Sequence, residues 1–134
     1  MSEAIVSHYF AKMNELLAKQ KYSFSKASSE DVPKEPGVYA IFDTRAKAVI
    51  YIGRTRNLRR RLLRDHKRGN VEGSQFRRAL GKNFGLESET DITNYILENC
   101  SFQVMVIKEF EDMVRLEHFT TAVLGPFLNI QLKQ

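Results

Sequence analysis

Apolar residues near the N-terminus recur at the spacing of a helix. Five of them define the pattern, and they are Ile5, Tyr9, Met13, Leu16 and Leu17. Their period predicts an amphipathic helix over residues 4–20, with one stripe that must pack against another part of the protein. Residues 22–36 lose the pattern and contain Pro33 and Pro36. We therefore expect a connecting loop before the main fold begins.

Two short segments after this loop have the composition of β-strands. Residues 38–42 and 48–52 are rich in β-branched and aromatic side chains, and polar residues 43–47 separate them. This arrangement predicts an antiparallel β-hairpin. Residues 102–107 are apolar at both alternating sets of positions, which predicts a third strand in a central place in the sheet.

Helical spacing returns in four further segments, which are residues 57–68, 75–83, 91–99 and 110–124. Asn57 and Asp91 are suited to cap the first and third of these helices, and Gly125-Pro126 ends the last. The order of elements predicts an α+β fold, with a small three-stranded antiparallel sheet flanked by helices. We divide it into an N-terminal helix and loop extension, residues 1–35, and a main domain, residues 36–134.

The composition fits one globular domain in a reducing compartment. The chain has 134 residues, of which 43% are hydrophobic and 28% charged. Its single cysteine, Cys100, has no partner for an intrachain disulfide. Residues 1–20 do not read as a signal peptide, and no run of about 18 apolar residues exists to span a membrane. We expect a cytoplasmic protein without membrane contact.

Basic residues are concentrated in one part of the chain. Residues 54–82 hold eleven Lys and Arg against two acids, a net charge of +9, whereas the whole chain carries +5. Such a region is suited to bind phosphate backbones, because each neutralised phosphate releases counterions. Two other interpretations stay open at this point: a solvated helix face, or a scaffold that docks an acidic protein.

Two tripeptides mark the predicted hairpin. Gly37-Val38-Tyr39 begins its first strand, and Tyr51-Ile52-Gly53 ends its second. They resemble the two halves of the motif that names the GIY-YIG nuclease family, with Val38 in place of the family's isoleucine. The resemblance implies the GIY-YIG fold for the main domain, with residues 1–36 as an addition outside it.

The resemblance extends to the following helix and to the end of the chain. Arg61 stands eight residues after Gly53, where the family has its catalytic arginine. Glu117 is followed twelve residues later by Asn129, similar to the family's glutamate and asparagine. Glu117 also falls among the apolar residues of its helix, which are Phe110, Met113, Val114 and Leu124. A carboxylate in that stripe is costly unless it is paired or binds a metal.

What the resemblance implies is metal-dependent hydrolysis of phosphodiester bonds in DNA. Glu117 would be the sole protein ligand of Mg²⁺ or Mn²⁺, hard cations that keep several waters. Arg61 would hold the phosphate and offset charge in the transition state. Tyr39 or Tyr51 would take a proton from the attacking water, although a phenol with a pKa of about 10 needs nearby positive charge to do so. Further contacts with nucleic acid are expected from Gly53, Arg54, Arg56, Arg60, Arg64, His66, Arg68 and Asn129.

Two features of this interpretation are structural predictions. Tyr39 and Tyr51 can serve one site only if they share a sheet face, which requires an odd-length hairpin loop or a compensating bulge. Many family members have His or Tyr four residues after the arginine, where this chain has Asp65, with His66 one residue later. One residue rotates a helical position by about 100°, so His66 is either a surface histidine or belongs to a helix with a shifted register. His118 is expected to pack or to face solvent.

The main alternative to an endonuclease is a nucleic-acid-binding module that has the same fold but no turnover. All four predicted catalytic residues, Tyr39, Tyr51, Arg61 and Glu117, are present, which favours the enzyme. One active site cuts one strand, so we expect a nick from a monomer or weak homodimer. DNA is the expected partner, with structured RNA left open. The N-terminal helix is expected to cover the sheet, with a dimer interface or a substrate contact as alternatives.

Overall fold

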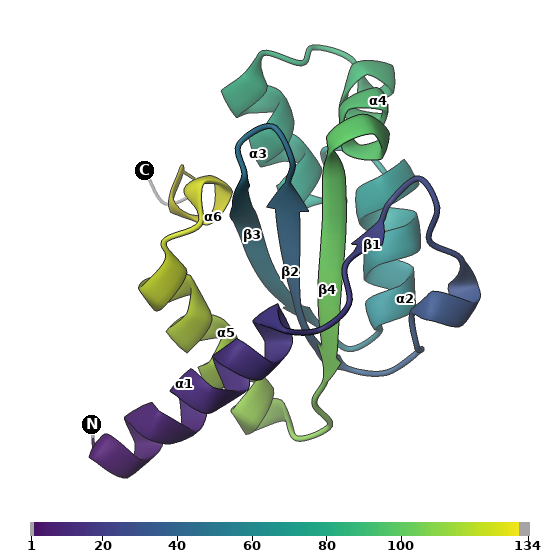
Figure 1. The fold of residues 1–134 in the computed structure, drawn as a ribbon. Helices are drawn as coiled ribbons and strands as arrows, with labels where there is room; N and C mark the ends of the chain where they lie inside the picture. The colour runs from purple at the N-terminus through teal and green to yellow at the C-terminus, as the bar shows by residue number, and fades with distance from the viewer. Residues whose placement is uncertain (1, 132–134) are drawn as a thin grey trace.

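The computed structural model describes residues 2–131 and has an α+β architecture. Its helices and strands are, in chain order, α1 (Glu3–Leu17), β1 (Tyr22–Ser23), η1 (Ser29–Asp31), β2 (Gly37–Asp43), β3 (Ala48–Thr55), α2 (Leu58–Arg60), η2 (Arg61–His66), α3 (Gln75–Phe84), α4 (Glu89–Asn99), β4 (Cys100–Val106), α5 (Phe110–Leu124) and α6 (Phe127–Gln131). Helices flank the sheet on both faces (Figure 1). The predicted fold class is confirmed.

The sheet has four antiparallel strands in the order β1-β4-β2-β3. The extra strand, β1, lies in the segment expected to be loop, where Tyr22 pairs with Phe102 and Ser23 with Ser101. Two residues of strand are too short to give a periodic sequence signal. Because β1 pairs with β4, the strand around Phe102 is an interior strand, as its apolar composition predicts.

The two faces of the sheet have different partners. The tyrosine face carries Tyr39, Ile41 and Tyr51 and packs mainly against η2, α3 and α4. The α5 face carries Val38, Ala40 and Ile52 and packs against α1 and α5. Tyr9, Met13 and Leu16 of α1 are buried on the α5 face. This confirms that the N-terminal helix covers the sheet.

A bulge in the β2–β3 hairpin sets the face of Tyr51. Next to the four-residue turn, Asp43 pairs with Ala48 and Phe42 with Val49. The register then shifts, and Ile41 pairs with Tyr51, which leaves Ile50 as the extra residue. Without that shift Tyr51 would point to the α5 face. The predicted compensating bulge is therefore present.

Several local expectations need correction. Ser88, not Asp91, caps α4, because its hydroxyl accepts a hydrogen bond from the Asp91 N–H and the helix begins at Glu89. The buried side of α5 is formed by Met113, Leu116 and Thr120. Phe110 and Leu124, expected on the apolar side, are exposed. The short helix α6 was not predicted. Among the described residues no helix is long and apolar enough to cross a membrane.

Candidate active site

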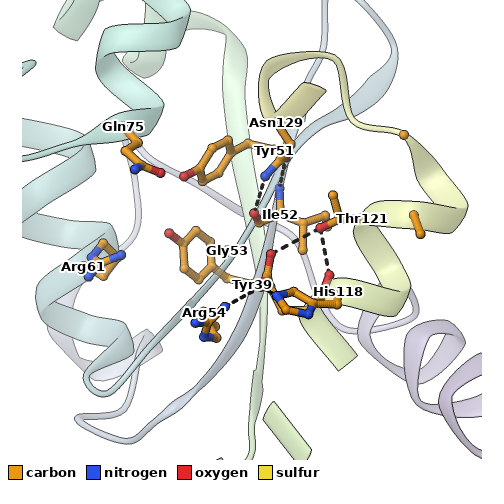
Figure 2. Close-up of a pocket in the computed structure, with 13 residues that line it drawn as sticks. Tyr39, Tyr51, Ile52, Gly53, Arg54, Arg61, Gln75, His118, Thr121 and Asn129 are labelled. Atoms are coloured by element: carbon orange, nitrogen blue, oxygen red, sulfur yellow. Dashed lines mark hydrogen bonds and ion pairs between the residues drawn. The ribbon is translucent and has the colours of Figure 1, made fainter. Parts of the chain in front are cut away.

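An open cleft of about 790 Å³ lies beside the edge strand β3 and is bordered by α5, α6 and the start of α3. Figure 2 shows that it gathers side chains from both halves of the chain. The residues that line it are Tyr39, Tyr51, Ile52, Gly53, Arg54, Arg61, Gln75, Glu117, His118, Thr121, Ala122, Gly125 and Asn129. All four predicted catalytic residues are in this set.

The two tyrosines approach each other on the tyrosine face. Their ring centroids are 6.4 Å apart, and Figure 2 shows both hydroxyls directed toward the side of the cleft that holds Arg61 and Gln75. Gly53, opposite Tyr39 in the hairpin, makes room for this arrangement. A Cβ at position 53 would overlap the ring and hydroxyl of Tyr39. Position 53 must therefore be glycine to leave space for the Tyr39 side chain. This is in addition to the expected role of Gly53 beside a phosphate.

Tyr39 is the first member of a buried chain of hydrogen bonds. Its hydroxyl lies 2.7 Å from Nε2 of His66, and Nδ1 of His66 lies 2.8 Å from Oγ of Ser74. Oγ of Ser74 also accepts the backbone N–H of Arg77. The His66 side chain is buried, with 1% of its residue surface exposed. The surface-histidine alternative is therefore wrong, and a direct contact of His66 with a phosphate does not fit this structure.

A π-helical turn explains the position of His66. Segment η2 is a π-helix from Arg61 to His66, directly after the single α-helical turn of α2. A π-helix has i→i+5 hydrogen bonds and a wider turn, so the residue five positions on takes about the angular place that the fourth takes in an α-helix. His66 consequently reaches the cleft side that also holds Arg61, although one more residue separates them than in the family pattern. Asp65 instead pairs with Arg61, at 3.5 Å between Oδ2 and Nε.

Burial controls the protonation of these groups. Desolvation raises the pKa of Tyr39 well above its ordinary value, with a further rise from Tyr51 and an opposing effect of Arg61. Desolvation also raises the pKa of Tyr51 to about 12, and Arg61 again opposes it. Burial and the charges of Arg61 and Arg77 lower the pKa of His66 to about 3. Near neutral pH both phenols are protonated and the imidazole is neutral.

Glu117 enters the cleft from the other side, on α5. Its side chain is 14% exposed and accepts a 2.6 Å hydrogen bond from Nη1 of Arg54 on Oε1. Oγ1 of Thr121 lies 3.3 Å from Oε2, and Nε2 of His118 lies 3.5 Å from Oε1. Of the described residues that line the cleft, Glu117 alone is acidic. No group of three or more potential metal ligands exists among the described residues.

This donor set fits Mg²⁺ or Mn²⁺ and not a metal that needs a full protein cage. A hard cation can bind through one carboxylate while it keeps waters and takes a substrate phosphate oxygen. The carboxylate of Glu117, although largely buried, lines an open cleft with room for such waters. Zinc, by contrast, takes three or four protein ligands from His, Cys or carboxylates. The expected assignment of Glu117 as a single ligand is consistent with this geometry.

The other predicted nucleic-acid contacts fall into two groups. Arg56, Arg60, Arg64 and Arg68 are exposed, as phosphate contacts must be. Asn129 has a structural task, because its Oδ1 accepts the N–H of Ile52 and its Nδ2 donates to the C=O of Ile52, both at 2.8 Å. Its amide therefore pairs with the edge of β3 as a neighbouring strand would. A role in orienting nearby groups fits this pairing better than a substrate contact does.

Not every arginine of the basic region faces solvent. Arg77 is fully buried and donates to the carbonyls of His66, Lys67 and Glu89 and to the Glu89 carboxylate. It holds η2 against α3 and α4, so it adds no charge to a binding surface, although it was counted in the basic region. Sequence reasoning also missed Ser74, Gln75 and Thr121. A cap signal was available only for Ser74, which directly precedes a predicted helix and accepts the Arg77 N–H.

Comparisons with known proteins bear on this site. Three solved structures of the GIY-YIG N-terminal endonuclease domain of UvrC from Thermotoga maritima are similar to the chain, one of them bound to magnesium and two of them point mutants with a divalent cation. Each is 20% identical and covers 96% of this chain and 97–98% of its own, with TM-scores of 0.44–0.47. No curated protein matches. A model of the GIY-YIG catalytic domain matches residues 8–134, and with this match over nearly the whole sequence the chain belongs to the GIY-YIG nuclease family.

Proposed function

We propose that the protein is a metal-dependent endonuclease that hydrolyses phosphodiester bonds in DNA and makes one nick per active site. The observation that carries the proposal is the convergence of two tyrosines, two arginines and one carboxylate in a single open cleft. The arginines supply positive charge for a phosphate, and the carboxylate supplies a site for a divalent cation. The basic residues exposed nearby are suited to the rest of the nucleic-acid backbone.

Glu117 would hold Mg²⁺ or Mn²⁺ in this mechanism. A bound divalent cation would supply positive charge that stabilises the phosphate and the leaving oxygen. In this structure Arg54 forms an ion pair with the Glu117 carboxylate. When a phosphate binds, the Arg54 guanidinium would pair with the phosphate and leave the carboxylate to the cation. Arg61 is half-exposed at the opposite wall and would donate to the phosphate oxygens as charge develops. The two arginines and the cation site thus surround one position in the cleft.

Tyr39 is the tyrosine that we assign as the base. Its hydroxyl has a specific partner in His66, whereas no side-chain hydrogen bond of Tyr51 is found among the described residues. We place the His66 proton on Nδ1, where it donates to Ser74, so that Nε2 accepts the Tyr39 proton. As Tyr39 takes a proton from the attacking water, its own proton passes to Nε2. Burial and the charges of Arg61 and Arg77 oppose this transfer, because they lower the pKa of His66. A negatively charged phosphate bound at Arg61 would offset part of that effect and favour the protonated imidazole.

The test is a nicking assay on supercoiled plasmid with Mg²⁺, with Mn²⁺ and with EDTA. Wild type is compared with Glu117→Gln, which keeps the size of the side chain and removes its charge. The matched control is Glu111→Gln on the same helix, where the glutamate is exposed and, among the described residues, forms an ion pair only with Arg115. We expect wild type and the control to relax the plasmid with metal, and EDTA and Glu117→Gln to abolish relaxation.

The other outcomes separate the alternatives. A different result would be that neither wild type nor any variant cuts, while all of them shift DNA on a gel and this binding weakens as the salt concentration rises. The protein would then be the binding module without turnover. Cutting by Glu117→Gln at the wild-type rate would refute the metal site at Glu117. Binding of an acidic protein without binding of DNA would favour the scaffold interpretation.

A further inference from the structure

A second cleft continues from the active-site cleft and contains an exposed aromatic ring. It measures about 410 Å³ and shares Arg54 and Arg61 with the active-site cleft. Phe110, the first residue of α5, lines it together with Arg56 and Arg60. At 57% exposure, Phe110 is the most exposed large apolar residue among those that the structure describes. We call this the Phe110 cleft.

The charge of the Phe110 cleft is positive. Four arginines line it, at positions 54, 56, 60 and 61, and the one acid in its lining is Asp65. Asp65 is already paired, at 3.5 Å from Nε of Arg61 and 3.2 Å from Nε of Arg64. Arg56 and Arg60 are exposed, and no ion pair of theirs is found among the described residues. The cleft therefore offers charge to an anion that lies beside the aromatic ring.

An aromatic ring among arginines is suited to an unpaired nucleotide. A base in a continuous duplex has both faces covered by its neighbours, so it cannot stack on a protein ring. A single-stranded or extruded base can, while its phosphates bind the nearby cations. Phe110 belongs to neither core cluster, and Met113 is the buried residue of this helix turn.

We propose that Phe110 stacks on the base of an unpaired nucleotide next to the scissile phosphate, with Arg56 and Arg60 on the flanking phosphates. The preferred substrate is then DNA with a single-stranded branch or an extruded base, rather than continuous duplex. This inference rests on the proposed nuclease function, since it uses the shared border of the two clefts to place the scissile phosphate. It assigns a substrate class to the same site.

The experiment measures binding in EDTA, so that no cleavage occurs. Three fluorescein-labelled DNA probes of one sequence are used: a continuous duplex, a duplex with a single-stranded flap, and the single strand. The variants are Phe110→Ala and Phe110→Trp. The matched control is Val123→Ala, on the same helix, 51% exposed and outside both clefts. Urea unfolding checks that each variant is folded.

We expect Phe110→Ala to raise the Kd for the flap probe by about 5- to 150-fold, the usual range for loss of one stacked base, and to leave the duplex Kd unchanged. Phe110→Trp should retain flap binding, and Val123→Ala should match wild type. A 2-aminopurine at the branch should be quenched by wild type and not by Phe110→Ala.

If Phe110→Ala lost the same affinity for the flap probe as for the duplex probe, the inference would be overturned, because the variant would then have a general defect in phosphate binding. Wild-type affinity of Phe110→Ala for every probe would also overturn it, and would instead mark Phe110 as a contact for another macromolecule. If that result came with normal metal-dependent nicking by wild type, the nuclease proposal would stand and the stacking proposal alone would fail. If wild type bound none of the probes at low salt, both the nuclease proposal and the stacking proposal would be refuted.

Discussion

On one side of strand β3 the cleft receives Tyr39 and Tyr51, and on the other side it receives Glu117 and Arg54. The tyrosine side is closed: both phenols are buried, and Tyr39 is fixed by His66 and Ser74. The α5 side is more open, with an ion pair between partly exposed side chains. Groups from opposite faces of a sheet can meet in one cleft here because β3 is an edge strand.

The difference suggests a division of tasks between the two sides. Buried, doubly hydrogen-bonded groups hold one geometry, which suits a proton transfer. A carboxylate held by an arginine that is 37% exposed can exchange that partner for a cation and its waters. Substitutions on the two sides should therefore impair different properties of the protein. Three predictions test this comparison.

The largest effect is expected from Tyr39→Phe. Loss of the hydroxyl removes the proposed base and should lower kcat by about 10²- to 10⁴-fold. Binding of Mn²⁺ should be unchanged, because Glu117 lies on the other side of β3. Single-turnover nicking and calorimetric titration of Mn²⁺ measure the two quantities. Tyr51→Phe is the matched variant, and a larger loss of kcat there than in Tyr39→Phe would reassign the base to Tyr51.

Leu16→Ala should weaken the α5 face without changing the chemistry. Leu16 is fully buried between α1 and the sheet, and truncation of a buried leucine costs about 2–5 kcal/mol of unfolding free energy. The nicking rate at a temperature where the variant is still folded should equal that of wild type. Urea unfolding gives the free energy, with the less buried Leu17→Ala as a milder comparison. A reduced kcat in folded Leu16→Ala would show that α1 positions Glu117 through α5.

The smallest effect is the dependence of stability on pH on the tyrosine side. The pKa of His66 is lowered from 6.5 to about 3 in the folded protein, so between these pH values the unfolded chain binds more protons. His66 therefore lowers the unfolding free energy as pH falls below 6.5, by at most about 1.4 kcal/mol per pH unit. His66→Gln should show a shallower loss of stability than wild type in urea titrations between pH 7 and pH 5. Parallel curves would mean that His66 is accessible to protons in the folded state.

The sequence was sufficient to predict the larger elements and the four motif residues that meet in the cleft. Periodicity located α1, α3 and α5, and the hairpin's strands followed from their composition. The motif residues Tyr39, Tyr51, Arg61 and Glu117 meet as expected. The prediction that a bulge is needed to bring Tyr39 and Tyr51 to one sheet face was also correct. Side chains alternate strictly between the faces of a sheet, and one register shift, the bulge at Ile50, separates the two parts of the β2–β3 pairing.

The parts that could not be predicted depend on tertiary contacts. The π-helical turn has no composition signal; it is held in place where Arg77 binds the carbonyls of His66 and Lys67. Phe110 was expected on an apolar side, but its place at the first turn of α5 leaves it beside a basic cleft. The strand β1 exists because β4 offers it an edge. The division of the chain at residue 35 stays a prediction.

Asn129 also affects how the protein behaves at high concentration. An edge strand with free N–H and C=O groups is a template on which a strand of another molecule can add, which leads to aggregation. Asn129 uses both backbone groups of Ile52, at the middle of the exposed edge of β3. A foreign strand would have to displace this amide before it could pair there. The side chain that holds α6 beside the cleft thus also protects the edge strand of the proposed active site from pairing with a strand of a second molecule.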